Sequence, residues 1–161
     1  ILENVGCLGD EAELNPAPTR GATMLTTPLT HPELLAALAR CGHGTKILIA
    51  DGNYPHLTGV PAGTTRIALN VTPGLLTVDQ ILEPLARTIP LEACEFMLTA
   101  EAGTAPAVDG YAALLPGVPF TGHERFAFYD TARQPDVGLI IATGDQRQYA
   151  NLLITVGVVT P

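Results

Sequence analysis

The sequence predicts a single α/β domain in which helices cover a mixed or largely parallel sheet. Its 161 residues are 47% hydrophobic, enough for one substantial core and too few to argue for two. Short apolar runs alternate along the chain with stretches whose apolar residues recur at helical spacing. Strands that alternate with helices in this way are typical of α/β domains.

The first helix and strand follow the N-terminal segment. The helix is expected to begin near Thr30 or His31, either of which can cap it, with Pro32 in the first turn and Gly42 at its end. Residues 47–50 then form a continuous apolar run between Gly44 and Asp51-Gly52. Such a run predicts a strand that is buried on both faces.

The middle of the chain repeats this alternation. Thr77 is a plausible cap for a second helix, and Pro84 within it should kink or shorten that helix. The expected order is a strand over residues 66–70, a helix over 77–88, a strand over 96–100 and a helix that begins within 103–111.

The C-terminal third is expected to contain three strands. Residues 125–129 (RFAFY) alternate as a strand does, 137–143 (VGLIIAT) form the most strand-like segment of the chain, and 152–159 close it.

Charge and composition exclude several classes of partner. The net charge of −8 leaves no basic patch for nucleic acid, and no apolar run approaches the roughly 20 residues that span a bilayer, so a soluble protein is expected. Cys7, Cys41 and Cys94 are odd in number and lack zinc-site spacing, which fits a reducing cytoplasm. Residues 1–23 are acidic and aperiodic and are expected to form a tail or extension, with the domain spanning 24–161.

Two polar residues flank the first predicted strand. His43 lies between two glycines and can exchange a proton near neutral pH, although it could also simply help to end the helix. Asp51 lies at the carboxyl end, where α/β sheets bind ligands, although it could equally close an Asx-turn with Gly52 and Asn53. At about 3.3 Å per residue, the strand separates His43 from Asp51 by roughly 15 Å or more. If both serve one site, we expect His43 of one subunit to face Asp51 of its neighbour.

Two further pairs of polar residues are spaced two apart. Tyr149 and Asn151 leave a loop together and offer neutral donors and acceptors suited to carbohydrate hydroxyls, or they are a packed tyrosine and a turn asparagine. His123 and Arg125 can share one side of a strand, or be solvated charges. The chain lacks the glycine-rich nucleotide loops, the G-x-S-x-G elbow and zinc-ligand spacing, so we expect proton-transfer chemistry on a neutral polar ligand with no cofactor and no metal.

Three segments of the chain are, in order, LTHPELLAALARCGHGTKILIADGNYP, RFAFYDTAR and IIATGDQRQYANLLITVGVVTP. In sequence and in order they resemble the RbsD/FucU family of D-ribose pyranases and L-fucose mutarotases, and the resemblance runs from about Met24 to Pro161. It implies a three-layer α/β/α fold with a mixed sheet and a cofactor-independent isomerase of monosaccharides. It also implies a homo-oligomer, typically a decamer, with sites at subunit interfaces.

The resemblance also implies roles for particular residues. His43 corresponds to the proposed proton donor, and Asp51 to a sugar-binding carboxylate. The Tyr-x-Asn motif supplies Tyr149, Asn151 and the backbone of Ala150 as further contacts.

The branch within the family depends on two conflicting signals. ERFAFY resembles the fucose mutarotase type, with Arg125 as a substrate-binding residue, and favours that type. GTTRIALNVTPG around Arg66 looks more like the ribose pyranase type, in which His123 would bind substrate. A non-catalytic sugar-binding or transport-associated protein and a purely structural oligomer are the alternatives from other classes. The retained His43 argues against the former, and the polar set of His43, Asp51, Tyr149 and Asn151 argues against the latter.

Overall fold

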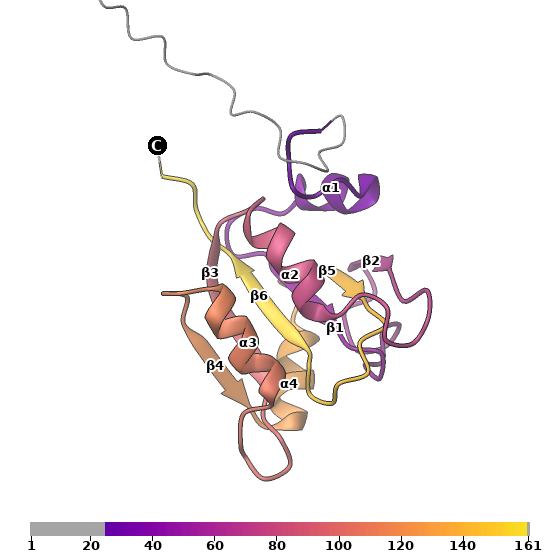
Figure 1. The fold of residues 1–161 in the computed structure, drawn as a ribbon, viewed down its shortest axis with the longest axis vertical. Helices are drawn as coiled ribbons and strands as arrows, with labels where there is room; N and C mark the ends of the chain where they lie inside the picture. Colours follow the sequence, from indigo (N-terminus) through magenta and orange to yellow (C-terminus); the bar gives the residue numbers. More distant parts are fainter. Residues whose placement is uncertain (1–24, 161) are drawn as a thin grey trace, which may run out of the picture.

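The structure, a computed structural model, describes residues 25–160 and contains a six-stranded mixed sheet with helices on both faces (Figure 1). The expectations for residues 1–23, including Cys7, lie outside the described residues. The strands are β1 (Lys46–Ala50), β2 (Thr65–Ala68), β3 (Leu91–Met97), β4 (Phe120–His123), β5 (Val137–Ala142) and β6 (Leu152–Val156). The helices are α1 (Pro32–Leu38), α2 (Val78–Ala86), α3 (Pro106–Leu114) and α4 (Arg125–Ala132).

The sheet order is β2-β5-β1-β6-β3-β4, and β6 is antiparallel to both of its neighbours. The parallel pairs are β1 with β5, β2 with β5, and β3 with β4. In the register, Ala50 pairs with Ala142, and Phe96 pairs with Leu152. The carboxyl ends of the parallel strands therefore meet the beginning of β6 at one edge of the sheet, which we call the carboxyl edge.

Two apolar clusters fill the space on either side of the sheet. Ile47 and Ile49 of β1 belong to the cluster that contains α1, α2 and α3, whereas Leu48 belongs to the cluster that contains Phe128 of α4. Because successive side chains of a strand point to opposite faces, this split shows that β1 is covered on both sides. The expected three-layer α/β/α arrangement is confirmed.

The helix starts follow from local capping. The imidazole Nδ1 of His31 accepts a hydrogen bond from the backbone N–H of Leu34 (3.2 Å), which caps α1. At α2, the side-chain oxygen of Gln80 accepts from the N–H of Thr77 (2.9 Å). Pro84 lies two residues before the end of α2, so the helix passes through it and stops soon afterwards.

The predicted strand over residues 125–129 is wrong: this segment is helix α4. The carboxylate of Glu124 caps the helix by accepting from the N–H groups of Phe126 (2.9 Å) and Ala127 (3.4 Å). Phe126 is 69% exposed while Phe128 is fully buried, because residues two apart lie on different sides of a helix. A short strand, β4, comes directly before α4 and was not predicted.

Smaller differences concern the ends of elements. The strand expected at 96–100 begins at Leu91 and ends at Met97, whereas the helix expected to begin within 103–111 does so, since α3 starts at Pro106. The last strand ends at Val156, three residues earlier than expected.

The helical assignment of α4 predicts unequal effects of two phenylalanine substitutions. Phe128→Ala should lower the free energy of unfolding by about 3–5 kcal/mol because it empties a fully buried site. Phe126→Ala should change it by less than about 1 kcal/mol because that ring is exposed. Urea unfolding measures both values; similar losses would contradict the helix, since a strand would place both rings on one face.

Candidate functional site

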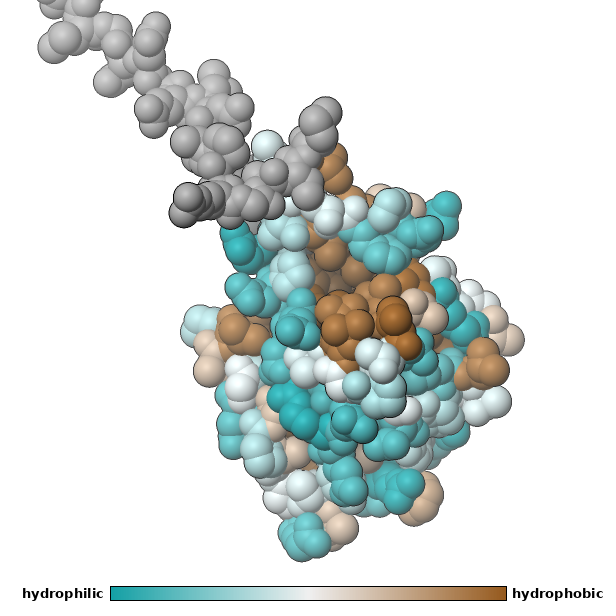
Figure 2. Space-filling view, turned by 45° about the vertical axis from the view of Figure 1, so that its right-hand side comes forward, coloured by the Kyte–Doolittle hydropathy of each residue, from teal (hydrophilic) through white to brown (hydrophobic). Residues whose placement is uncertain are grey.

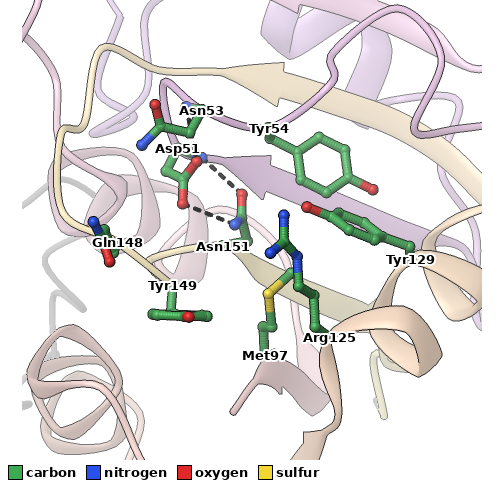
Figure 3. Close-up of a pocket in the computed structure, with 9 residues that line it drawn as sticks. All are labelled: Asp51, Asn53, Tyr54, Met97, Arg125, Tyr129, Gln148, Tyr149 and Asn151. Carbon is green, nitrogen blue, oxygen red and sulfur yellow. Dashed lines mark hydrogen bonds between the residues drawn. The ribbon is translucent and has the colours of Figure 1, made fainter. Parts of the chain in front are cut away.

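A cavity of about 370 Å³ opens at the carboxyl edge of the sheet (Figure 3). Its walls come from the turn after β1, the end of β3, the start of α4 and the loop that leads into β6. The lining residues are Asp51, Asn53, Tyr54, Met97, Arg125, Tyr129, Gln148, Tyr149 and Asn151. The structure therefore brings together four residues predicted from the sequence, namely Asp51, Arg125, Tyr149 and Asn151.

Asp51 and Asn151 form a reciprocal hydrogen-bonded pair between β1 and β6. The Asn151 Nδ2 donates to Asp51 Oδ2 (2.8 Å), and the backbone N–H of Asp51 donates to Asn151 Oδ1 (2.9 Å). The Asp51 Oδ1 accepts from the N–H of Asn53 (3.0 Å), which is the Asx-turn. Asp51 therefore closes the expected Asx-turn and at the same time lines the cavity.

Burial sets the electrostatics of Asp51. The residue is 2% exposed, and this burial raises the pKa of its carboxyl, against the opposing effect of backbone N–H groups of Asn53, Ala150 and Tyr54. Among residues 25–160 no lysine, arginine or histidine forms an ion pair with it. A carboxylate with this environment is suited to accept hydrogen bonds from neutral hydroxyl groups.

The Tyr-x-Asn segment contributes through side chains at both ends and backbone in the middle. Tyr149 and Asn151 both line the cavity, as their spacing predicts. Ala150 is fully buried, and its carbonyl accepts a hydrogen bond from the Tyr111 hydroxyl (2.9 Å). The methyl group of Ala150 therefore lies away from solvent, and only its backbone takes part near the site.

Arg125 reaches the cavity as the first residue of α4. Its guanidinium carbon lies 5.9 Å from the centre of the Tyr129 ring, and Figure 3 shows the group extended toward Asn151. The sequence reasoning missed Asn53, Tyr54, Met97, Tyr129 and Gln148. Asn53 and Tyr54 follow Asp51 within one turn and could have been included on that ground, whereas nothing local distinguishes Met97.

His123 does not line the cavity. Its Nε2 is 2.6 Å from Glu95 Oε2, and Lys46 Nζ is 2.9 Å from the other oxygen of that carboxylate. Burial by itself would raise the pKa of Glu95, but these two partners outweigh it and hold the pKa below its ordinary value. Glu95 thus ties β1, β3 and β4 together.

His43 comes shortly before β1, whereas Asp51 comes directly after it, so the two residues lie at opposite ends of this strand. The N–H of the next residue, Gly44, donates to the carbonyl of Val156 at the end of β6 (2.9 Å). The imidazole is 58% exposed and its Nε2 is 2.8 Å from Glu92 Oε2. Within one chain, His43 and the cavity are therefore separated by the whole of β1.

Within the described part of the chain, no three His, Cys, Asp or Glu residues gather as metal ligands would. None of its helices has the length and apolar character needed to cross a membrane. Cys41 and Cys94 are free cysteines.

Comparison with known proteins decides the family. A sequence model of the RbsD / FucU transport protein family matches residues 24–159. This chain belongs to that family. A D-ribose pyranase of Paracidovorax citrulli is 34% identical over 84% of this chain and 98% of its own length. A fucose mutarotase of Bos taurus is 32% identical over 83% of this chain and 92% of its own length. The structure of Bacillus subtilis RbsD complexed with D-ribose superposes with a TM-score of 0.71 at 26% identity, covering 82% of this chain and 96% of the other.

Within this member of the RbsD / FucU family, the depressed pKa of Glu95 predicts a pH-dependent contribution to stability. Glu95→Gln should lower the free energy of unfolding by about 1–3 kcal/mol at pH 7, because Lys46 and His123 lose a charged partner. A lowered folded-state pKa stabilises the fold above the unfolded pKa of about 4.5, and this contribution disappears as the pH falls through the folded-state pKa. The difference between variant and wild type should therefore shrink steadily below about pH 4.5.

Glu92→Gln is the matched control, because Glu92 also lies on β3 and also pairs with a histidine, but is exposed. Its effect on urea unfolding should be within about 0.5 kcal/mol. An effect of Glu95→Gln that is equally small, or that does not vary with pH, would contradict the structural role of Glu95.

Proposed function

We propose that this protein is a cofactor-independent sugar mutarotase that interconverts the α and β anomers of L-fucose or a related monosaccharide. The observation that carries the proposal is the cavity at the carboxyl edge, which is lined by a buried carboxylate, three side-chain amides, a guanidinium and three phenols. Such groups match the hydroxyls of a sugar in both donor and acceptor character. The named relatives, a D-ribose pyranase and a fucose mutarotase, support a monosaccharide as the ligand.

The chemistry needs an acid and a base but no metal or nicotinamide. Ring opening removes the proton of the anomeric hydroxyl and delivers a proton to the ring oxygen; the open-chain aldehyde then turns and closes again. We assign proton donation to His43, with Asp51, Arg125, Tyr149, Asn151 and the backbone of Ala150 binding the sugar. General acid–base catalysis of this kind is worth roughly 10²- to 10⁴-fold in rate.

The position of His43 makes the proposed site intermolecular. Because β1 separates His43 from Asp51 by roughly 15 Å, one sugar cannot contact both in a single subunit. We propose a homo-oligomer, a decamer in the form that the family resemblance implies, in which His43 of one subunit completes the cavity of a neighbour. Exposed apolar side chains such as Leu57, Val71 and Phe126 are available to subunit contacts.

The geometry favours a fucose-type sugar over ribose. Arg125, the residue associated with the fucose type, lines the cavity, whereas His123, associated with the ribose type, is engaged by Glu95. Arg66 donates to loop carbonyls, those of Thr64 (2.8 Å) and Pro61 (3.0 Å) among them, and so braces its own segment.

D-ribose pyranase activity is the second candidate, supported by the 34% identity to a D-ribose pyranase. In that case His123 would have to leave Glu95 to contact the sugar.

Saturation-transfer NMR on L-fucose and D-ribose tests the function. We expect the wild-type protein to accelerate α/β exchange of L-fucose, and His43→Ala to reduce that acceleration by about 10²- to 10⁴-fold while sugar binding is partly retained. His31→Asn, which keeps a capping side chain at another histidine, should retain wild-type rates. Selective acceleration of pyranose–furanose exchange in ribose would move the protein to the pyranase type. Acceleration of neither sugar by a folded oligomer would favour a binding protein.

Mixing two inactive variants tests the shared site. His43→Ala and Asp51→Asn subunits, unfolded and refolded together in equal amounts, should recover about a quarter of wild-type activity, since random assembly joins an intact His43 to an intact Asp51 at one interface in four. Each variant refolded alone is the control. An inactive mixture that has demonstrably co-assembled would place His43 and Asp51 in separate sites.

A further inference from the structure

Tyr149 has a backbone conformation that its side chain disfavours. Its φ is +59°, in the left-handed region that glycine and asparagine tolerate and bulky residues rarely adopt. Tyr149 also lines the cavity, so this strained residue is one of the proposed sugar contacts. Strain at such a position persists only when the surrounding structure holds it.

On its carboxyl side, Tyr149 is followed by residues that are firmly attached. The Ala150 carbonyl accepts from the Tyr111 hydroxyl, and its N–H donates to the Asp51 carboxylate. Asn151 bonds Asp51 in both directions. This side of the segment cannot shift without breaking buried hydrogen bonds.

On its amino side, the attachment is a charged cluster around Arg147. The guanidinium donates through Nε to Asp145 Oδ1 (3.0 Å) and through Nη2 to Asp145 Oδ2 (2.6 Å) and Asp79 Oδ2 (2.5 Å). The backbone N–H of Arg147 also donates to Asp145 Oδ1 (3.0 Å). We call Arg147, Asp145 and Asp79 the arginine clamp.

The clamp is itself joined to two fixed elements. Asp145 is 1% exposed, and its Oδ2 accepts from the N–H of Val78 at the start of α2 (3.0 Å). Its carbonyl accepts from the N–H of Gly52 in the turn after β1 (2.8 Å). Arg147 is therefore connected through Asp145 to the turn that carries the proposed sugar-binding carboxylate, Asp51.

We propose that Arg147 is a positioning residue for Tyr149. The clamp holds the amino side of the loop, the Asp51 bonds hold its carboxyl side, and together they keep Tyr149 in the left-handed conformation that directs its side chain into the cavity. The link to sugar binding rests on the proposed function, whereas the link between Arg147 and the backbone at residue 149 stands independently of it.

Removing the clamp should change sugar binding more than turnover. Without the clamp, the backbone at Tyr149 relaxes out of the strained left-handed conformation. Sugar can then bind only to the fraction of molecules in which the loop has the conformation that places Tyr149 in the cavity. This raises KM by the inverse of that fraction and leaves kcat at saturation nearly unchanged.

Hydrogen exchange at the Ala150 amide tests the backbone step without any sugar. Arg147→Met should raise the opening constant of this amide about tenfold or more, because charge-assisted hydrogen bonds are lost. Adding Tyr149→Gly should lower it again by about fivefold or more, because glycine adopts the left-handed conformation without strain. The matched control is Gln148→Gly combined with Arg147→Met. It adds the same backbone freedom but relieves no positive φ, so it should not lower the opening constant of the Ala150 amide.

The exchange kinetics of L-fucose test the functional step. Arg147→Met should raise KM about three- to tenfold, with kcat within twofold of wild type. Arg147→Lys keeps the charge but not the bidentate geometry, so its KM should lie between those of the wild type and Arg147→Met. Arg87→Met removes an exposed arginine at the C-terminal end of α2, the opposite end of that helix from Asp79, and should change neither constant. If Arg147→Met does not fold, Arg147→Lys carries both measurements.

The outcomes separate the proposals. Unchanged protection of Ala150, or recovery by Gln148→Gly equal to that by Tyr149→Gly, would overturn the positioning role of Arg147. Altered protection with unchanged KM would overturn its link to sugar binding. If the wild type accelerates the anomer exchange of no sugar, the proposed function fails. The hydrogen-exchange results still decide whether Arg147 holds the backbone at Tyr149.

Discussion

The reciprocal pair of Asp51 and Asn151 is the interaction on which the candidate site depends. It joins two residues 100 positions apart in the chain, at adjoining ends of the neighbouring strands β1 and β6. A buried carboxylate is costly unless hydrogen bonds compensate for lost water, and here backbone and amide donors supply them. The turn after β1 and the loop before β6 are both fixed to this pair. The remaining cavity walls, from β3 and α4, are brought beside it by the register of the sheet.

Three carboxylates of the fold differ in the charge of the groups that surround them. Burial acts on each of them, but Glu95 and Asp145 have cationic partners that hold their pKa values low. Asp51 has neutral partners, and its pKa is raised. The ion pairs of Glu95 join three strands, and those of Arg147 with Asp145 and Asp79 join the loop before β6 to α2. Asp51, which has no cationic partner among the described residues, is the one of the three to which the proposed function gives a sugar-binding role.

Local sequence predicts those parts of the fold and site that depend on local constraints. The apolar run of β1 and the Asp-Gly turn after it are visible because a doubly buried strand excludes polar residues. Tyr149 and Asn151 are likewise predictable from their spacing. The segment RFAFY misleads because its alternation mimics a strand, while the capping by Glu124 that makes it a helix involves one side chain and two amides. Met97 and Tyr129 enter the cavity only through the packing of β3 and α4, which no short pattern reveals.

His123 differs from expectation for a geometric reason. The spacing allowed His123 and Arg125 to share one side of a strand, but the strand ends at His123 and a helix begins at Arg125. The change of element directs Arg125 into the cavity and leaves His123 beside Glu95 on the sheet. Two residues that are two positions apart in the sequence therefore have different surroundings.

The separation of His43 from Asp51 also bears on how subunits must assemble if the proposed site is correct. β1 is a rigid element at the centre of the sheet, so no loop movement can bring its two ends together. In an isologous dimer, each subunit would give its His43 to the same partner from which it receives one, and sites would occur in pairs. In a heterologous ring, each subunit would give His43 to one neighbour and receive it from another, and ring closure would be required for every site to be complete. In both arrangements an isolated subunit has a sugar-binding cavity without its acid, so activity would follow the assembly equilibrium whereas part of the binding would not.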